Sequence, residues 1–239
     1  MESNKIALVT GAAVRIGRAI SRSFAEAGYD LLLHYHSSAS AVETLAEELK
    51  SHGSHVKTIR ADFSRPGQIR EMWQRLPEEW TPQVLVNNAS VFYDSGLEDS
   101  GMQDLELNMQ VNFRSAYLLT KLFAEQAADD SNIINILDTR INRYDAQFID
   151  YALSKKLLTE FTRVSARILG PKIRVNGIAP GLILPPPGHT ISYLQQKAQK
   201  IPLQRAGDVQ NITKTLLFLL ENNFITGQII FVDGGEHLL

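Results

Sequence analysis

Short apolar runs alternate along the chain with longer stretches in which apolar residues recur at helical spacing. The short runs are nearly continuous in Val, Ile and Leu, which is typical of strands buried on both faces. This pattern predicts seven strands, at Ile6–Val9, Asp30–Tyr35, Val56–Ala61, Val84–Asn87, Ile133–Leu137, Ile173–Ile178 and Ile229–Val232. It predicts helices between them, at Ile16–Ala27, Ala39–Lys50, Gly67–Leu76, Met102–Ala128, Tyr151–Leu169 and Val209–Leu220. We therefore expect an α/β fold: one doubly wound parallel sheet with helices on both faces, spanning residues 1–239 as a single domain.

One long segment, residues 182–204, lacks a clear period and contains Pro185, Pro186 and Pro187. Long irregular segments in compact domains are often lids over a site. We predict a substrate lid at about residues 182–204, with an ordinary surface loop as the alternative.

Composition narrows the class of protein. The chain has 239 residues, 44% hydrophobic and 21% charged, with a formal net charge of -2, so we expect no nucleic-acid or membrane-surface partner. The absence of cysteine excludes disulfides and thiolate chemistry and fits a cytoplasmic location. We expect neither a signal peptide nor a membrane-spanning segment, and the histidine spacings suggest no metal site.

The first predicted strand leads directly into Thr10–Gly17. Gly11 lets the backbone turn sharply off the strand, and Gly17 lets the next helix pack close to the sheet, so that its first N–H groups face a pyrophosphate. A tight turn without a ligand is the alternative, but a position after the first strand of an α/β chain favours nucleotide binding. Arg15 can pair with a phosphate or with a planar ligand.

The end of the second predicted strand bears on which nucleotide is bound. It reads His34-Tyr35-His36-Ser37, with no acid before Glu43. An Asp or Glu near this place usually binds the free ribose hydroxyls of NAD. Because imidazoles and hydroxyls suit a 2′-phosphate instead, we predict NADP; a polar strand end without a ligand is the alternative.

The sequence contains two Tyr-x-x-x-Lys patterns, Tyr117–Lys121 and Tyr151–Lys155. Tyr151 begins a helix shortly after a strand, where the carboxyl edge of a parallel sheet presents its ligands. We therefore predict that Tyr151 and Lys155 are functional and that Tyr117 serves packing or a subunit contact. The lysine ammonium should lower the pKa of the phenol from its usual value near 10, which lets Tyr151 exchange a proton near neutral pH.

These features together resemble the short-chain dehydrogenase/reductase superfamily over nearly the full chain. The resemblance also uses Asp62, Asn87–Ser90, Asn112, Pro180-Gly181 and Val232–Gly235. It implies a Rossmann-type fold and an NADPH-dependent oxidoreductase, with Tyr151 as proton donor, Lys155 on the nicotinamide ribose and Asn112 supporting a proton-relay water. It also implies a homotetramer. The cofactor residues that we expect are Gly11, Arg15, Ile16, Gly17, His34, Tyr35, His36, Ser37, Asp62, Phe63, Asn88, Ala89, Ser90, Tyr151, Lys155, Pro180, Gly181 and Leu182.

One position departs from the superfamily pattern. A serine usually precedes the tyrosine, whereas this chain has Asp138-Thr139-Arg140 and no serine from Ile133 through Asp150. Aspartate at this place resembles the pteridine reductase subfamily, as do Arg15 in the first turn and the stretch from Asn88 to Tyr93. That resemblance implies a pterin stacked on Phe92. The substrate-binding residues that we expect are Arg15, Ser90, Phe92, Asp138, Tyr151 and Tyr193.

The chemistry of Asp138 is consistent with this resemblance. An ionised aspartate would repel the alkoxide that forms in carbonyl reduction, whereas reduction of a C=N bond builds charge on a nitrogen that needs a proton. We therefore predict a reductase of a C=N bond in a dihydropterin or folate-type substrate, with Asp138, Tyr151, Lys155 and Asn112 as the catalytic residues. Two alternatives stay open: a ketoacyl or small-carbonyl reductase that uses Thr139 in place of the serine, and a non-catalytic NADP-binding regulatory protein.

Overall fold

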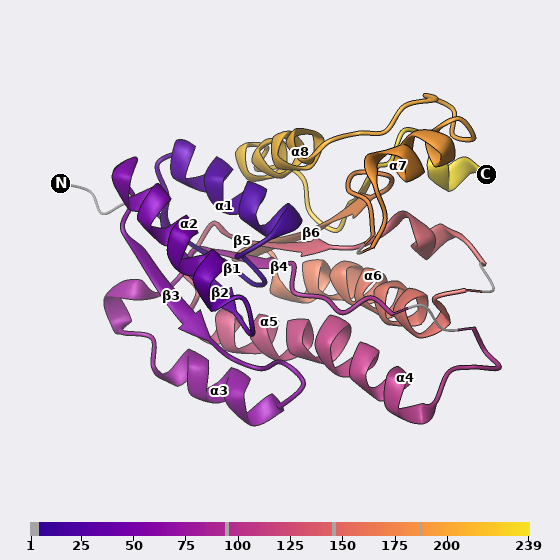
Figure 1. Cartoon of the computed structure of the whole chain (residues 1–239). Helices are drawn as coiled ribbons and strands as arrows, with labels where there is room; N and C mark the ends of the chain where they lie inside the picture. Colours follow the sequence, from indigo (N-terminus) through magenta and orange to yellow (C-terminus); the bar gives the residue numbers. More distant parts are fainter. Residues whose placement is uncertain (1–4, 94–95, 145–146, 187) are drawn as a thin grey trace.

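The seven predicted strands are all present, and they form one sheet (Figure 1). The computed structural model describes residues 5–93, 96–144, 147–186 and 188–239. The strands run in the order β3-β2-β1-β4-β5-β6-β7, and every neighbouring pair is parallel. Their bounds are β1 Ile6–Val9, β2 Asp30–Tyr35, β3 Val56–Arg60, β4 Val84–Asn87, β5 Ser131–Ile136, β6 Ile173–Pro180 and β7 Ile229–Val232.

Helices cover both faces of this sheet (Figure 1). On one face lie α1 (Arg15–Glu26), α2 (Ala39–Ser51) and α8 (Val209–Glu221); on the other lie α3 (Pro66–Gln74), α5 (Ser115–Gln126) and α6 (Ile149–Leu169). Alternate strand residues enter the two cores, so Val9 packs under α1 and α8 while its neighbour Leu8 packs toward α3 and α5. The doubly wound prediction is therefore confirmed.

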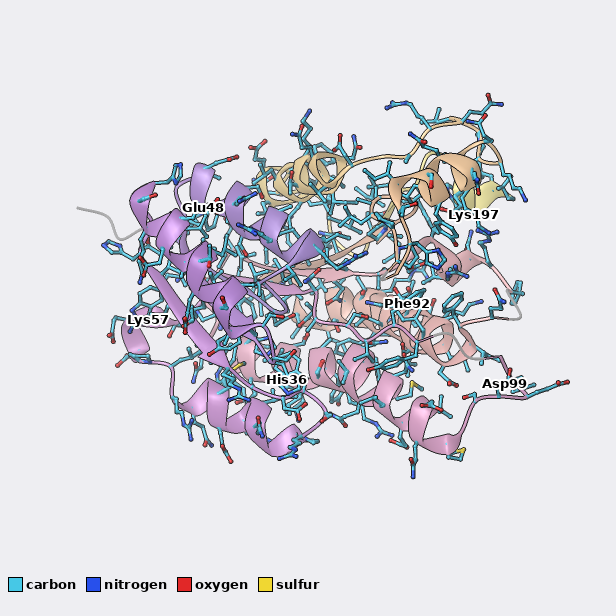
Figure 2. The ribbon with its side chains drawn as sticks, in the orientation of Figure 1. His36, Glu48, Lys57, Phe92, Asp99 and Lys197 are labelled. Atoms are coloured by element: carbon cyan, nitrogen blue, oxygen red, sulfur yellow. The ribbon has the colours of Figure 1, made fainter. Side chains whose placement is uncertain are left out.

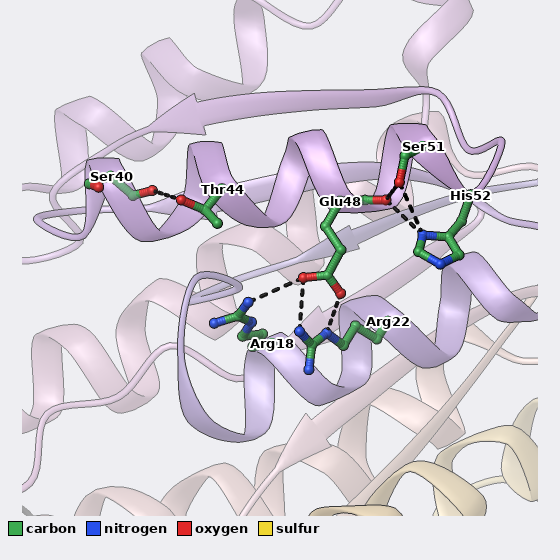
Figure 3. A network of polar contacts seen from close by, with 7 residues as sticks. All are labelled: Arg18, Arg22, Ser40, Thr44, Glu48, Ser51 and His52. Atoms are coloured by element: carbon green, nitrogen blue, oxygen red, sulfur yellow. Dashed lines mark hydrogen bonds and ion pairs between the residues drawn. The ribbon is translucent and has the colours of Figure 1, made fainter.

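An ion-pair cluster joins α1 to α2 at the surface of the first core. Glu48 of α2 accepts two hydrogen bonds from Arg22, at 2.6 and 2.8 Å, and one from Arg18 at 3.2 Å (Figure 3). Such a bidentate pair fixes the angle between two helices better than a single contact does. Because Arg18 follows the first turn directly, the cluster also anchors the start of α1.

The order of the strands determines where a ligand can bind. The connections run outward in one direction through β1, β2 and β3 and in the other through β4 to β7. In such sheets a crevice opens at the carboxyl ends of the two central strands, which here are β1 and β4. The turns after β1, β4, β5 and β6 all meet at that edge.

Two helical regions differ from the prediction. The stretch predicted as one helix, 102–128, consists of α4 (Met102–Asn108), a π-helical segment over Met109–Arg114 and α5. Both helix types place apolar residues on one side, so periodicity alone does not distinguish them. The segment 182–204 contains a helix that the pattern did not reveal, α7 (Ile191–Ala198). Of the three prolines there, Pro187 lies outside the described residues.

Two short 3-10 helices contribute to the cavity described below. They span Thr139–Asn142, after β5, and Glu236–Leu238, at the carboxyl end. Among the described residues, no helix combines the length and the apolar character needed to cross a membrane.

Candidate active site

A cavity of about 420 Å³ opens at the carboxyl edge of the sheet. Its walls come from the turns after β1, β4, β5 and β6, from α6, and from the segment that contains α7. Most of the predicted site residues line it: Gly11, Arg15, Ile16, Gly17, Asn88, Ala89, Ser90, Phe92, Asp138, Tyr151, Lys155, Pro180, Gly181, Leu182 and Tyr193. The topology thus brings together residues that are up to 182 positions apart in the sequence, from Gly11 to Tyr193.

Asp138 and Tyr151 form a direct pair on the cavity wall. The phenol of Tyr151 donates a hydrogen bond of 2.9 Å to Oδ2 of Asp138. The other carboxylate oxygen, Oδ1, accepts from the backbone N–H of Arg140 at 2.8 Å, which caps the 3-10 helix after β5. The carboxylate is therefore fixed at both oxygens, while the Asp138 residue keeps partial exposure to the cavity.

Burial changes the acidity of both members of this pair. It raises the pKa of Asp138 above its ordinary 3.8, although the hydrogen bonds from Arg140 and Tyr151 oppose the rise. Burial, with the charge of Asp138 added to it, raises the pKa of Tyr151 well above 10. The sequence-based prediction that a neighbouring ammonium lowers the phenol pKa is therefore wrong for this structure. Tyr151 is a neutral phenol that shares its proton with an acid.

Lys155 lies one helical turn beyond Tyr151 on α6. Its Nζ donates to the carbonyl oxygen of Ile136 at 2.8 Å and lies 5.7 Å from the centre of the Tyr151 ring. Only 2% of the residue is exposed, and this burial lowers its pKa to about 8, against the opposing charge of Asp138. A buried ammonium held on a backbone carbonyl at the cavity wall is well placed to bind ligand hydroxyls.

Asn112 lies behind the cavity, within the π-helical segment. Its Oδ1 accepts from the backbone N–H of Val91 at 2.8 Å and from Ser90 Oγ at 3.0 Å. Its Nδ2 donates to Ser154 Oγ at 3.0 Å and to Val91 O at 3.1 Å. The side chain thereby ties the segment after β4 to α6. π-helical turns often mark functional sites because they redirect a side chain from the regular helical face.

The first turn has the backbone of a phosphate cradle. Gly11 has a φ of 61°, which a residue with a side chain rarely adopts. A Cβ on Gly17 would lie 2.1 Å from the carbonyl oxygen of Gly11, so only glycine allows this approach. Asn88 holds the turn against β4, because its Nδ2 donates to Thr10 O at 2.8 Å and to Gly11 O at 3.1 Å. The residues present therefore fit a dinucleotide at the start of α1.

His34 has a different position from the one that the sequence suggested. It is 2% exposed, its Nδ1 accepts from the Gly11 N–H at 3.1 Å, and its Nε2 lies 3.0 Å from Ala61 O. The ring stacks on Phe63 at 3.9 Å. His34 therefore packs against the first turn on its buried side, and Phe63 packs against His34. In this position His34 is not placed to contact a phosphate. Burial lowers the pKa of His34 to about 4, so it is neutral.

The cationic groups at the end of β2 come largely from other elements. A second hollow there is lined by His36, Arg60, Asp62, Arg65, Gln68 and Arg75. Nε of Arg60, from the end of β3, donates to His36 O at 3.2 Å, and Arg65 lies 3.5 Å from Asp62. Tyr35 packs into the first core and Ser37 is exposed beside the hollow. Arg60 and Arg65 have no local sequence signal, because only the sheet register places the end of β3 beside the end of β2.

An aromatic group forms one wall of the cavity. Figure 2 labels Phe92, whose side chain comes from the segment after β4. Its ring meets the ring of Tyr151 edge-on at 4.8 Å and stacks on the ring of Phe148 at 4.5 Å. Phe148 has a φ of 57° at the start of α6, and the guanidinium of Arg140 lies 4.6 Å above its ring. Phe148 therefore positions Phe92 from behind. No sequence motif pointed to Phe148.

The opposite wall is the segment predicted as a lid. Tyr193 and Leu194 of α7 line the cavity, and the guanidinium of Arg15 donates to Pro185 O at 2.9 Å. Arg15 itself has a φ of 55°, a strained value for a residue with a side chain. This contact joins the first turn to the segment 182–204 across the cavity mouth.

Two other candidate residues have partners outside the Asp138–Tyr151 pair, although Thr139 also lines the cavity. Tyr117 is 45% exposed on α5, where its ring packs against Phe161 at 5.0 Å. The Oγ1 of Thr139 donates to Asp233 Oδ2 at 2.7 Å and is buried with it, so this hydroxyl already has an acceptor. Among the described residues, no cluster of His, Asp and Glu could hold a metal ion.

Known proteins resemble the chain along its whole length. Residues 11–237 match the family model described as enoyl-(acyl carrier protein) reductase. Pteridine reductase 1 of Leishmania tarentolae is 32% identical, covering 98% of this chain and 96% of that protein. The 3-oxoacyl-[acyl-carrier-protein] reductase FabG of Staphylococcus epidermidis is 30% identical, covering 98% and 100%.

A solved structure also matches. The FolM alternative dihydrofolate reductase 1 of Brucella canis, crystallised with NADP, superposes with a TM-score of 0.92 at 32% identity, covering 100% of this chain and 96% of that one.

Proposed function

This chain belongs to the short-chain dehydrogenase/reductase family, and we propose that within it the chain is an NADPH-dependent reductase of a C=N bond in a dihydropterin or folate-type substrate. Membership makes the chain an oxidoreductase. The choice of substrate rests on one observation, the hydrogen bond of 2.9 Å between Tyr151 and Asp138. The relatives include both pterin and ketoacyl reductases, so the site itself has to distinguish them.

NADPH fits the residues at the carboxyl edge. In our proposal the first turn holds the pyrophosphate, Asp62 lies at the adenine and Lys155 binds the nicotinamide ribose. The 2′-phosphate meets the hollow that contains Arg60 and Arg65, whose guanidinium groups suit phosphate oxygens. NADP in the matched Brucella structure supports the same assignment.

The residues of the chain manage the proton. NADPH supplies a hydride to the carbon of the C=N bond, and the nitrogen of that bond then needs one proton. Tyr151 presents its phenol proton on the cavity wall, and Asp138, whose pKa is raised, holds or replaces that proton through the shared hydrogen bond. Phe92 offers a flat apolar face to a heterocycle, and the phenol edge of Tyr151 lies beside it.

Asp138 disfavours a carbonyl substrate for a physical reason. Carbonyl reduction develops negative charge on oxygen, which an adjacent carboxylate opposes in a site of low dielectric. An imine nitrogen is more basic than a carbonyl oxygen, so it can take up its proton before or as the hydride arrives, and the same carboxylate then stabilises the positive charge on that nitrogen. Thr139, the residue that could replace the usual serine, donates its hydroxyl to Asp233 instead.

A ketoacyl reductase is the second candidate, supported by the identity to FabG. A non-catalytic NADP-binding protein is a weaker third, because Tyr151, Lys155 and Asn112 keep a complete set of hydrogen bonds around a cavity. The deciding experiment measures NADPH oxidation with dihydrobiopterin, dihydromonapterin, dihydrofolate and an acetoacetyl thioester. We expect turnover of at least one pterin or folate and little of the thioester. The reverse preference would refute the proposal, and turnover of none would favour the third candidate.

We also propose that the chain forms a homotetramer in the cytoplasm. Large apolar side chains are exposed on α5 and α6, namely Tyr117, Leu153, Leu157, Val164 and Ile168. Large apolar side chains left exposed on two neighbouring helices favour a protein partner. Light scattering during gel filtration should give four times the chain mass of 26.7 kDa, and Val164→Glu should lower that mass. A monomeric wild-type protein would contradict the assignment.

A further inference from the structure

The cavity contains a second acid that the mechanism does not use. Glu236 lies in the 3-10 helix at the carboxyl end and lines the same cavity as Asp138 and Tyr151. Its side chain is only 13% exposed. Oε1 accepts from Nη1 of Arg143 at 2.9 Å, whereas Oε2 is buried and has no hydrogen-bond partner within the described parts of the chain.

The fold holds this carboxylate in a defined place. Gly181 lies against it, because a Cβ there would come within 2.8 Å of Oε2 and within 2.5 Å of the Cβ of Asp233. Asp233 in turn accepts from Thr139 at 2.7 Å and from the backbone N–H of His237 at 2.8 Å. These contacts fix the turn before Glu236 and the residue after it. The unpartnered oxygen is therefore buried in a packed wall, against Gly181, which itself lines the cavity, and does not belong to a loose chain end.

A buried acceptor without a donor destabilises a fold by about 1–3 kcal/mol. Such a group needs an explanation, and at the wall of a cavity a ligand can supply the missing donor. The group that meets Oε2 must carry an O–H or N–H. An anionic carboxylate cannot play this part: although Arg15, Arg140 and Lys155 also line the cavity, an ionised carboxylate has no hydrogen to donate and would be repelled locally by Oε2.

We propose that Glu236 determines substrate specificity: its Oε2 accepts a hydrogen bond from an uncharged, donor-bearing part of the substrate. The cavity thereby prefers a neutral dihydropterin with a hydroxylated side chain over a folate-type molecule with an anionic tail. This inference rests on the proposed pterin reduction. It distinguishes dihydropterin from folate-type substrates, both of which the proposed function includes.

Glu236→Gln tests the inference with little change in shape. Arg143 donates to Oε1, so it keeps the amide oxygen on its side and turns the amide NH2 toward the cavity. The variant thus presents a donor where the wild-type chain presents an acceptor. We expect kcat/KM for dihydromonapterin to fall at least about tenfold, mainly through KM, which is the signature of lost binding. We expect kcat/KM for dihydrofolate to stay level or rise.

Glu47→Gln is the matched control, since Glu47 is exposed on α2 and lines none of the cavities described. It removes the same charge and should leave the ratio of the two kcat/KM values unchanged. Melting temperature and NADPH affinity verify that each variant is folded. If Glu236→Gln does not fold, the wild-type protein still tests the inference: titration with biopterin and folic acid, followed by quenching of protein fluorescence, should show at least about tenfold tighter binding of biopterin.

Three outcomes separate the claims. A wild-type protein that reduces no pterin refutes the proposed function, and the inference with it. A wild-type protein that reduces dihydromonapterin, together with a Glu236→Gln variant whose substrate ratio lies within twofold of wild type, overturns the role of Glu236 alone. Preference for the anionic substrate by the wild-type protein overturns it as well.

Discussion

The phenol of Tyr151 donates a hydrogen bond of 2.9 Å to the carboxylate of Asp138. Burial raises the pKa of both groups. The pair therefore holds at least one proton over a wide pH range, with the donor at the wall of the cavity. This arrangement suits a reaction that ends with a proton on nitrogen.

Replacing Asp138 with Asn should separate the two kinds of reduction. The amide keeps the size of the side chain and removes its ability to relay a proton, so we expect kcat with a dihydropterin to fall about 100- to 1,000-fold, within the range of general acid catalysis. KM should change little. Asp138→Ser, which restores the usual hydroxyl, should gain activity on an acetoacetyl thioester. Retained pterin turnover in Asp138→Asn would exclude Asp138 from the proton transfer.

The activity should decline as pH rises. Asp138 has a folded pKa above its ordinary 3.8, so it loses its proton as pH increases through that raised value, and the pair then has one proton fewer to deliver. We expect kcat for a dihydropterin at saturating NADPH to decrease as pH rises through the raised pKa of Asp138. In Asp138→Asn this falling limb should disappear, because the group that titrates is gone while burial, the largest cause of the raised pKa of Tyr151, remains. A flat wild-type profile would contradict this assignment.

The buried ammonium of Lys155, which we propose binds the nicotinamide ribose, should lower the free energy of unfolding. Burial depresses its pKa from 10.5 to about 8, so the unfolded chain binds more protons between these values and stability is lost as pH falls from 10.5 to about 8. Lys155→Met removes the buried ammonium. We expect the cofactor-free variant to melt about 3–6 °C higher near pH 7, a net gain of about 1–2 kcal/mol after loss of the hydrogen bond to Ile136, and to lose activity.

The pH dependence of the same variant serves as a control. The difference in free energy of unfolding between Lys155→Met and the wild-type protein should become smaller as pH rises from 8 to 10, because Lys155 of the folded wild-type protein becomes neutral there. Denaturant unfolding at several pH values measures that difference. An advantage independent of pH would mean that packing, and not the charge, accounts for it.

Arg60 should select the phosphorylated cofactor. Arg60→Ala removes one guanidinium from the hollow beside His36, so the Kd for NADPH should rise about tenfold while that for NADH stays the same. Arg70→Ala is the matched control, because Arg70 is exposed on α3 and does not line the hollow. Nucleotide fluorescence titrations measure both constants. Equal losses for the two cofactors would argue against a phosphate contact.

Much of the architecture could be predicted because strands buried on both faces leave continuous apolar runs. The bounds of β1, β2, β4 and β7 agree with the prediction at every residue. The π-helical segment escaped detection because it keeps its apolar face, and α7 escaped because three prolines before it suggested irregular structure. The spacing of the motifs also correctly predicted that Asp138, Tyr151 and Lys155 lie close together.

The sequence did not reveal how deeply each side chain is buried or which distant residues it contacts. His34 has the chemistry of a phosphate ligand, but the fold directs its ring beneath the first turn. Arg60 reaches its hollow because of the sheet register, and Glu236 reaches the cavity because of the fold of the carboxyl end. Neither placement has a local signal in the sequence. The predicted direction of the Tyr151 pKa was wrong because the desolvation of a phenol depends on everything packed around it.

In the π-helical segment over Met109–Arg114, the number of residues matters as much as the identity of their side chains. A π turn accommodates one more residue than an α turn does. A single-residue deletion there would let the segment relax to α-helical geometry and would turn the Asn112 side chain away from the direction that the π turn gives it. Asn112 would then lose its partners on both sides, although every side chain of the catalytic set would still be encoded. Variants of this enzyme should therefore tolerate substitutions along α4 far better than changes of even one residue in its length.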